Sequence, residues 1–224
     1  MKLALQTSAS GLFGLVFFGA ALFWPAGTFD YWQAWVFIGV FLAATLIPSI
    51  YLAVKDPAAL RRRMHGGPTA ETRLVQKIVI SLTIVAVLAV LVVSALDHRF
   101  GWSDVPTAVV ILGDVLVAGG LLLAQFVVFQ NSFAGASIRV EAEQHVVSTG
   151  LYGLVRHPMY FGTLLMMFGT SIALGSYWGL VPTILAIPIL GVRISDEEHM
   201  LRAELDGYDE YTHKVRYRLL PYVW

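Results

Sequence analysis

Long apolar runs alternate with shorter polar segments along most of the chain. A helix needs about 20 mostly apolar residues to cross the hydrocarbon core of a bilayer. The last two runs are short for a full span and only Gly175 and Ser176 separate them, which predicts a tilted helical hairpin. The pattern therefore predicts an all-α fold, an integral membrane helical bundle of five to six transmembrane helices. The apolar runs predict helices at residues 9–24, 35–54, 74–96, 106–129, 159–174 and 177–192.

The polar segments between these runs are expected to form loops and one surface helix. Pro25 begins a predicted turn after the first run, and residues 97–104 are a predicted short loop after the third. Residues 55–77 and 130–156 are longer polar stretches, the second of them at least partly extended or looped. Residues 195–218 form a charged amphipathic tail, which we expect to be a helix on the membrane surface.

The composition is that of a membrane protein. Hydrophobic residues make up 57% of the chain and charged residues only 13%, whereas soluble domains carry about 25% charged residues. The formal net charge is zero, so charge provides no argument for a nucleic-acid partner. The chain contains no cysteine, which excludes disulfides, thiolate catalysis and sulfur-ligated metal sites.

The distribution of basic residues predicts the orientation of the chain. With six helices, segments 55–77, 130–156 and 195–218 lie on the same side of the membrane and carry most of the Lys and Arg residues. Arg99 lies on the other side. Because loops rich in Lys and Arg remain in the cytoplasm, we expect the basic side to be cytoplasmic.

A polar cluster, residues 148–162 (STGLYGLVRHPMYFG), lies between two apolar regions. Proline disfavours helical geometry in the residue before it and suits the first turn of a helix. We therefore expect His157 to lie at the mouth of a helix that begins near Met159. The unpaired N–H groups and the positive dipole end of a helix start can bind an anion. The side chains available for chemistry in this cluster are Tyr152, Arg156, His157 and Tyr160.

A second polar cluster, residues 193–198 (RISDEE), ends the last apolar run. Arg193 and Glu197 are four residues apart and share one face of a continuing helix. They form either a helix-terminal ion pair or a binding pair, in which Glu197 accepts hydrogen bonds from ribose hydroxyls and Arg193 binds an anionic substrate group. His157 is likewise either a hydrogen-bonded interfacial residue or a catalytic one. In the functional interpretation, the two clusters face each other at one membrane surface and hold a charged cofactor.

Several other polar residues give weaker signals. Asp114 lies inside an apolar run, and an acid at membrane depth is a functional candidate by default. Arg61, Arg62 and Arg63 are interpreted as a topology signal or a contact for anionic lipids. The histidines show no metal-ligand spacing, and the usual nucleotide-binding and nucleophile-elbow motifs do not occur. A nucleotide-like cofactor would therefore bind outside the usual soluble folds.

The motifs STGLYGLVRHPMYFG, RISDEEHML, GYDEY and VRYRLLP occur in this order within residues 144–224. With this combination of motifs, the C-terminal third of the chain resembles the isoprenylcysteine carboxyl methyltransferases, and more specifically the bacterial members of that family. That family and the phospholipid N-methyltransferases form a superfamily of integral membrane enzymes that depend on S-adenosyl-L-methionine. Together with the orientation predicted from the basic residues, this leads us to expect a bacterial inner-membrane protein whose active site faces the cytoplasm.

The resemblance also implies roles for individual residues. Arg193 matches an arginine on the substrate side and is, with His157, the implied catalytic residue. A glutamine that the family places earlier in the loop would fall near Ser137, so that role is not transferred. The implied division is 1–130 for the N-terminal transmembrane helices and 131–224 for the cofactor-binding catalytic region, within one membrane domain. The implied cofactor-binding residues are Gln144, His145, Val146, Val147, Tyr152, His157, Pro158, Met159, Tyr160 and Glu197.

The expected reaction is methyl transfer to a lipophilic acceptor, first of all a carboxylate of the isoprenylcysteine type. Methyl transfer from a sulfonium to an ionised carboxylate needs no strong base, so catalysis would consist of positioning and charge placement. If the acceptor is an amine, as for a phospholipid N-methyltransferase, His157 or Glu198 becomes a candidate base. Two other possibilities stay open: an NADPH-dependent sterol-type reductase, which shares an R-H-P-x-Y-x-G element, and a non-catalytic membrane scaffold. The expected partners are a lipid-like substrate and membrane lipids, without nucleic acid or metal.

Overall fold

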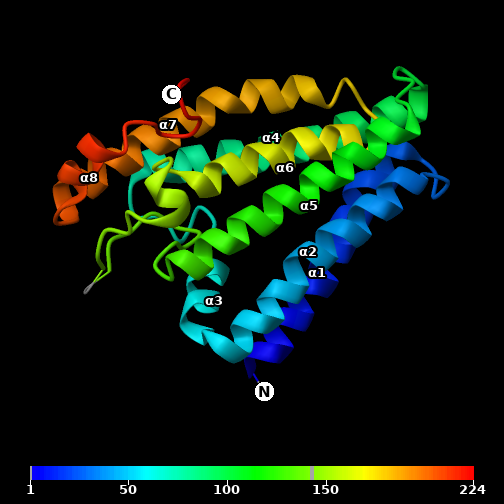
Figure 1. Ribbon diagram of the computed structural model, residues 1–224. Helices are drawn as coiled ribbons and strands as arrows, with labels where there is room; N and C mark the ends of the chain where they lie inside the picture. The colour runs from blue at the N-terminus through cyan, green and yellow to red at the C-terminus, as the bar shows by residue number, and fades with distance from the viewer. Residues whose placement is uncertain (1, 142–143) are drawn as a thin grey trace.

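The computed structural model describes residues 2–141 and 144–224, and within these ranges all regular structure is helical (Figure 1). The predicted all-α class is confirmed. The long helices are α1 (Lys2–Ala26), α2 (Trp32–Lys55), α4 (Leu74–Phe100), α5 (Thr107–Gln130), α6 (Pro158–Ala173) and α7 (Leu180–Glu204). The short ones are α3 (Pro57–Met64), α8 (Tyr208–Lys214) and the 3-10 helix η1 (Gly150–Gly153).

The helices have the length and composition of a membrane bundle. Within the described ranges, α2, α4 and α5 are each long and apolar enough to cross a membrane by themselves. Two shorter apolar helices accompany them, Gly11–Ala26 within α1 and the whole of α6. α7 is apolar only in its first half, because its second half carries the 193–198 cluster. These features agree with an integral membrane helical bundle.

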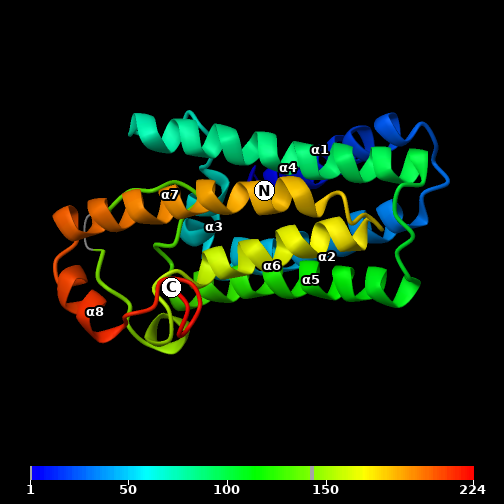
Figure 2. The ribbon, with the colours of Figure 1, turned by 90° about the horizontal axis from the view of Figure 1, so that it is seen from above.

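The six long helices form a closed ring that does not follow chain order. α1 contacts α2 and α4, α2 contacts α5, and α6 contacts both α5 and α7. α7 closes the ring by packing against α4, and Figure 2 shows it lying between α4 and α6. The last helix of the chain is therefore inserted beside helices formed much earlier in the sequence.

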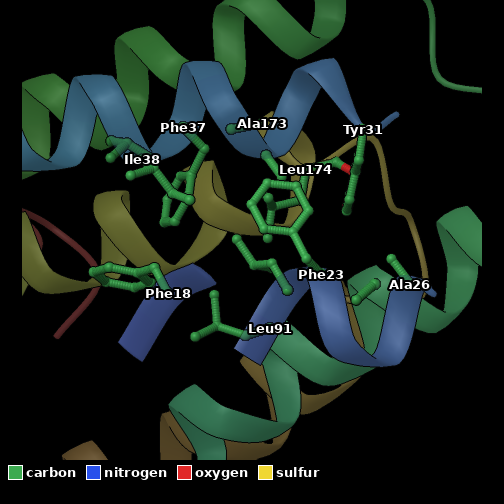
Figure 3. Close-up of a cluster of buried hydrophobic side chains, with 13 residues drawn as sticks. Phe18, Phe23, Ala26, Tyr31, Phe37, Ile38, Leu91, Ala173 and Leu174 are labelled. Atoms are coloured by element: carbon green, nitrogen blue, oxygen red, sulfur yellow. The ribbon is translucent and has the colours of Figure 1, made fainter. Parts of the chain in front are cut away.

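The main hydrophobic core lies near the connection between α1 and α2, at the end of the bundle away from α3 and α8 (Figure 1). Figure 3 shows its side chains. Phe18 and Phe23 of α1 pack there with Phe37 of α2 and Leu91 of α4. The hydroxyl of the buried Tyr31 donates a hydrogen bond of 2.6 Å to the carbonyl oxygen of Leu174, just after α6. This core holds one end of the ring together and leaves the other end available for polar groups.

Glycines bring the backbones of α5 and α6 into direct contact. A Cβ atom at Gly162 would lie 2.7 Å from the carbonyl oxygen of Gly120, and one at Gly169 would lie 2.8 Å from that of Gly113. Gly113 and Gly120 of α5 are seven residues apart, and so are Gly162 and Gly169 of α6. Each helix therefore presents its two glycines on one face. Small residues allow this kind of close approach between membrane helices. The contact fixes the start of α6 against α5.

The C-terminal boundaries differ from the prediction. The expected helix 177–192 and the first part of the expected surface helix 195–218 form one continuous helix, α7, because no helix-breaking residue separates them. The chain leaves this direction at Gly207, whose φ of 79° favours glycine, and α8 begins at the next residue. A single surface helix over 195–218 is therefore wrong, and segment 215–218 is not helical.

Three N-terminal details also differ. Pro25 was expected to begin the loop after the first helix, but it lies within the last helical turn of α1. Prolines are tolerated in apolar membrane helices. The predicted loop 97–104 begins later, since α4 continues to Phe100 and ends at Gly101 with φ 63°. The loop 55–77 contains α3, which begins at Pro57 and is capped by the side chain of Asp56. An aspartate followed by proline is a helix-start signal that the sequence did contain.

Candidate functional site

A cavity of about 370 Å³ lies where the end of α3, the start of α6 and the second half of α7 meet the segment 131–157. Its lining includes Arg193 and all the residues that the family resemblance implied for the cofactor. These are Gln144, His145, Val146, Val147, Tyr152, His157, Pro158, Met159, Tyr160 and Glu197. The structure thus brings the two predicted polar clusters together at one place, while a ligand for them remains a prediction.

Glu198 joins the two clusters. Its Oε1 accepts a 2.7 Å hydrogen bond from Nε of Arg156 and lies 3.2 Å from Nε2 of His157, and its Oε2 accepts one of 3.0 Å from Nε of Arg218. The carboxylate is only 3% exposed. Burial by itself raises the pKa of Glu198, but hydrogen bonds from His157, Arg156 and Arg218 outweigh it and lower that pKa to about 2. Glu198 is therefore ionised and holds the R-H-P segment in place.

Segment 215–218 completes this side of the site. Nη1 of Arg156 donates to two of its carbonyl oxygens, at 2.9 Å each. The backbone N–H groups of Arg156 and His157 donate to the carbonyl oxygens of Tyr217 and Arg218 at 2.9 and 2.8 Å. The approach to α6 is thus paired with the C-terminal segment, a contact that the sequence did not reveal.

Tyr160 connects Glu197 with Arg193. Its hydroxyl donates a 2.6 Å hydrogen bond to Oε2 of Glu197 and accepts one of 2.9 Å from Nε of Arg193. The side chains of the two predicted helix-face partners are therefore bridged by a tyrosine. The carboxylate with which Arg193 forms its ion pair is Glu71, at 3.2 Å.

Protein acceptors occupy the whole guanidinium of Arg193. Nη1 and Nη2 both donate to Oε1 of Glu71 at 3.2 Å, Nη1 also donates to Gln76 at 2.9 Å, and Nη2 to the carbonyl oxygen of Ala136 at 3.2 Å. Together with the bond to Tyr160, this matches the five N–H donors of an arginine. An anionic substrate at Arg193 would therefore compete with Glu71, which is 3% exposed.

Another part of the cavity wall is formed by the end of α5, the residue after it and η1. Nδ2 of Asn131 lies 3.4 Å from the hydroxyl of Tyr152, and Oε1 of Gln130 accepts a 3.1 Å hydrogen bond from the N–H of Leu151. The hydroxyl of Tyr211 donates to the carbonyl oxygen of Tyr152 at 2.7 Å. Burial raises the pKa of Tyr152 to about 12 despite the Asn131 hydrogen bond, so this phenol is neutral at physiological pH.

Sequence analysis missed several residues of the site and its support. Glu71 and Gln76 come from the polar loop before α4 and from its first turn, and both are buried. Gln76 also donates to Asp196, while Arg73 forms an ion pair of 2.6 Å with the same carboxylate. A polar Gln at the start of an apolar run was the available signal. Its role depends on the packing of α4 against α7, which brings Gln76 to Arg193 and Asp196.

Two residues singled out from the sequence lie elsewhere. Asp114 is buried in α5 and does not line the cavity, and its carboxylate oxygens have no hydrogen-bond partner among the described residues. Arg62 forms an ion pair of 2.9 Å with Glu141 and lines a shallow surface pocket with Arg61 and Arg139. Arg63, in contrast, lines the main cavity.

The cavity also has an apolar end. Side chains from four helices line it: Ile80 of α4, Leu121 of α5, Met166 of α6 and Leu190 of α7. These positions lie in the apolar parts of their helices. The cavity therefore combines charged groups near the helix ends with a hydrophobic region inside the bundle, as expected for a site that takes an amphipathic ligand.

A family model described as phospholipid methyltransferase matches residues 108–205. The matched region includes nearly all of α5 and the whole of α6 and α7, and hence most of the cavity wall. The match supports the superfamily to which the sequence motifs pointed, and with the apolar helices it indicates a membrane methyltransferase. A comparison with curated proteins gave no match.

Proposed function

We propose that the protein uses S-adenosyl-L-methionine to methylate a lipophilic acceptor, first of all a carboxylate of the isoprenylcysteine type. The observation that carries the proposal is the single cavity that gathers the implied cofactor residues with Glu197. The cavity volume of about 370 Å³ falls within the range of about 300–1,000 Å³ typical of small-molecule sites.

The groups in the cavity fit the cofactor by their chemistry. Tyr160 occupies Oε2 of Glu197, and among the described residues Oε1 accepts no hydrogen bond, so it is available to ligand hydroxyls. Val146 and Val147 offer apolar surface for a nucleobase. When bound, S-adenosyl-L-methionine supplies an electrophilic methyl group on a sulfonium.

The residues of the chain then have positioning tasks. The Glu198 network holds His157 and the start of α6, while Tyr160 orients Glu197. The apolar end of the cavity would take the hydrocarbon part of the acceptor from the bilayer. An acceptor carboxylate is already ionised at pH 7, so positioning and exclusion of water suffice for catalysis.

The second candidate is a phospholipid amine N-methyltransferase, which the description of the matching family model favours. An amine must lose its proton before it can attack, so this reaction needs a base with a pKa near the working pH. Glu198, whose pKa is about 2, is a poor base. Of the two candidates named from the sequence, this leaves His157, which lines the cavity.

The first test is calorimetric titration of the detergent-purified protein with S-adenosylhomocysteine, and with NADPH in parallel. Micromolar binding of S-adenosylhomocysteine alone is the expected result. Binding of NADPH alone would indicate the reductase, and binding of neither to folded protein would favour the scaffold.

Variants connect the binding to the cavity. Glu197→Gln and His157→Ala should each lower the affinity for S-adenosylhomocysteine. For Glu197→Gln the expected loss is about 10- to 100-fold, the cost of losing a charge-assisted hydrogen bond. Glu204→Gln, at an exposed position of the same helix, is the matched control. Arg193→Ala is expected to preserve binding and lose turnover. Equal affinity in the parent and all these variants would contradict the assignment.

The acceptor class can be assigned from the product. Membranes with the protein are incubated with methyl-labelled cofactor and either N-acetyl-S-farnesylcysteine or phosphatidylethanolamine. A methyl ester releases its label as methanol in alkali, whereas an N-methyl group does not. Alkali-labile label would support the carboxylate acceptor, and alkali-stable label in the lipid would support the amine.

A further inference from the structure

The arginines of the cavity differ in what they bind. Arg156 is paired with Glu198, Arg193 is paired with Glu71, and the exposed Arg139 forms an ion pair of 2.9 Å with Glu141. Arg63 lines the same cavity and has no carboxylate within ion-pair distance in the described part of the chain. Its guanidinium is the one in the cavity wall that the described residues leave without a counter-ion.

The single polar contact of Arg63 in the described ranges is weak. Its Nη1 lies 3.3 Å from Sδ of Met159, and a thioether is a poor acceptor. Burial lowers the pKa of the Arg63 guanidinium from its ordinary value, although an arginine stays charged at physiological pH. Arg63 is partly exposed, but a half-buried charge without a counter-ion is still costly, and an anionic ligand would reduce that cost.

The fold holds Arg63 at this position. Ala59 and Leu60, on the preceding turn of α3, pack in a small core with Leu52 of α2 and Val128 of α5. Met159 packs against the same core. The last turn of α3 is thereby docked beside the first turn of α6, which places the guanidinium at the cavity.

The start of α6 separates this cation from the acidic group of the site. Met159 contacts Arg63, and the next residue, Tyr160, contacts Glu197. Successive residues of a helix point about 100° apart. A positive and a negative group therefore flank the same helix start. A ligand with a carboxylate at one end and hydroxyls at the other can bind both.

We propose that Arg63 is the carboxylate-binding residue of the cavity. This inference rests on the proposed function and extends it to a residue outside the matched motifs. The carboxylate has two possible sources, the amino-acid end of the cofactor and the acid group of the acceptor. Both would form a charge-assisted, bidentate pair with the guanidinium.

The test compares ligand pairs that differ in this group. S-adenosylhomocysteine is titrated against methylthioadenosine, which lacks the amino-acid end, and N-acetyl-S-farnesylcysteine against its methyl ester. Each is measured on the parent, Arg63→Gln, Arg63→Lys and Arg61→Gln. Arg61 is exposed on the same helix and does not line the cavity, so its variant controls for lost charge near the site.

Arg63→Gln should bind one of the two acids about 10- to 100-fold more weakly and leave its neutral counterpart unchanged. A loss confined to S-adenosylhomocysteine assigns the carboxylate to the cofactor, and a loss confined to N-acetyl-S-farnesylcysteine assigns it to the acceptor. Arg63→Lys should fall between Arg63→Gln and the parent, because it keeps the charge without the planar fork.

Three results would overturn the inference. Unchanged affinity for both acids in Arg63→Gln would show that the cation binds neither carboxylate. An equal loss for acids and neutral counterparts would show that Arg63 only supports the fold. If the parent protein binds neither acid, the proposed function itself fails. The first two results leave the proposed function intact.

Discussion

Glu197 and Glu198 are neighbours in the sequence but have different environments. Successive helical residues point about 100° apart, so Glu198 turns towards Arg156 and Arg218 while Glu197 faces the cavity. The first is a buried structural anion and the second is available to a ligand. Two identical side chains thus acquire different chemistry from their position on α7.

The pKa of Glu198 leads to a prediction about acid stability. Because its pKa in the folded protein, about 2, is below that of a free glutamate, its contribution is complete above about pH 4.5 and is lost as the pH falls towards 2. Glu198→Gln should lower the unfolding free energy by about 3–5 kcal/mol at pH 7, since Arg156 and Arg218 lose a buried counter-ion.

The measurement is thermal unfolding in detergent from pH 7 to pH 3. The difference between the parent and Glu198→Gln should shrink as the pH falls. Glu204→Gln, exposed near the end of the same helix, should follow the parent. A difference that is constant with pH would contradict the role of Glu198 as an ionised hub.

Arg193 illustrates how surroundings change the interpretation of a residue. In the sequence it could be matched only with Glu197, four positions away. In the structure its counter-ion is Glu71, from a segment 122 residues earlier. Arg193→Ala would therefore leave the buried carboxylate of Glu71 without its counter-ion, with the N–H of Ile138 as its remaining donor. Loss of turnover in this variant must therefore be compared with its stability.

At the level of elements, the contact between α5 and α6 depends on glycines facing each other. Gly120→Ala should be destabilising by about 1–3 kcal/mol, because the new Cβ would overlap the backbone of α6. Gly119→Ala is an adjacent control, since a Cβ at Gly119 would have no atom within 4 Å. It should be neutral or slightly stabilising, because alanine favours a helix over glycine.

Thermal unfolding of both variants, with S-adenosylhomocysteine affinity as a second readout, tests this contact. Gly120→Ala should also lower the affinity for S-adenosylhomocysteine, because α6 begins at the cavity and is positioned by α5. Equal stability of the two variants would show that the helices can separate without cost.

At the scale of the whole molecule, the two ends of the bundle differ in charge and in the side chains that they bury. One end holds the aromatic core around Phe23 and Tyr31, and the other holds α3, α8 and the cavity. Figure 1 shows the connections α1–α2, α4–α5 and α6–α7 together at the first end. Most basic residues lie at the second end, which we expect to face the cytoplasm.

Single cysteines can test this orientation because the chain has none of its own. Asp104→Cys and Glu210→Cys lie at exposed positions at opposite ends of the bundle. A membrane-impermeant maleimide should label Asp104→Cys in right-side-out vesicles and Glu210→Cys only in inverted ones. The reverse pattern would place the cavity on the outer side, and the cysteine-free parent reports background labelling.

The sequence by itself determined the helical membrane bundle and the starting point of α6. Apolar runs report helices because a membrane span must bury its backbone polar groups internally. Pro158 marks a helix start because its ring restricts the residue before it, and α6 does begin there. These are local effects, so a single chain reveals them. The match of residues 108–205 to a phospholipid methyltransferase family model likewise comes from the sequence alone.

Only the tertiary structure decided which residues complete the site. Arg63 comes from a helix of eight residues in a predicted loop. Glu71 is 122 positions from Arg193, and segment 215–218 pairs with residues about 60 positions earlier. Such contacts depend on which helices become neighbours in the ring, and α7 comes to lie between α4 and α6 through packing rather than through any local signal. The fold therefore decides which counter-ions meet, because an ion pair such as Arg193–Glu71 offsets the cost of burying both charges only where packing brings them together.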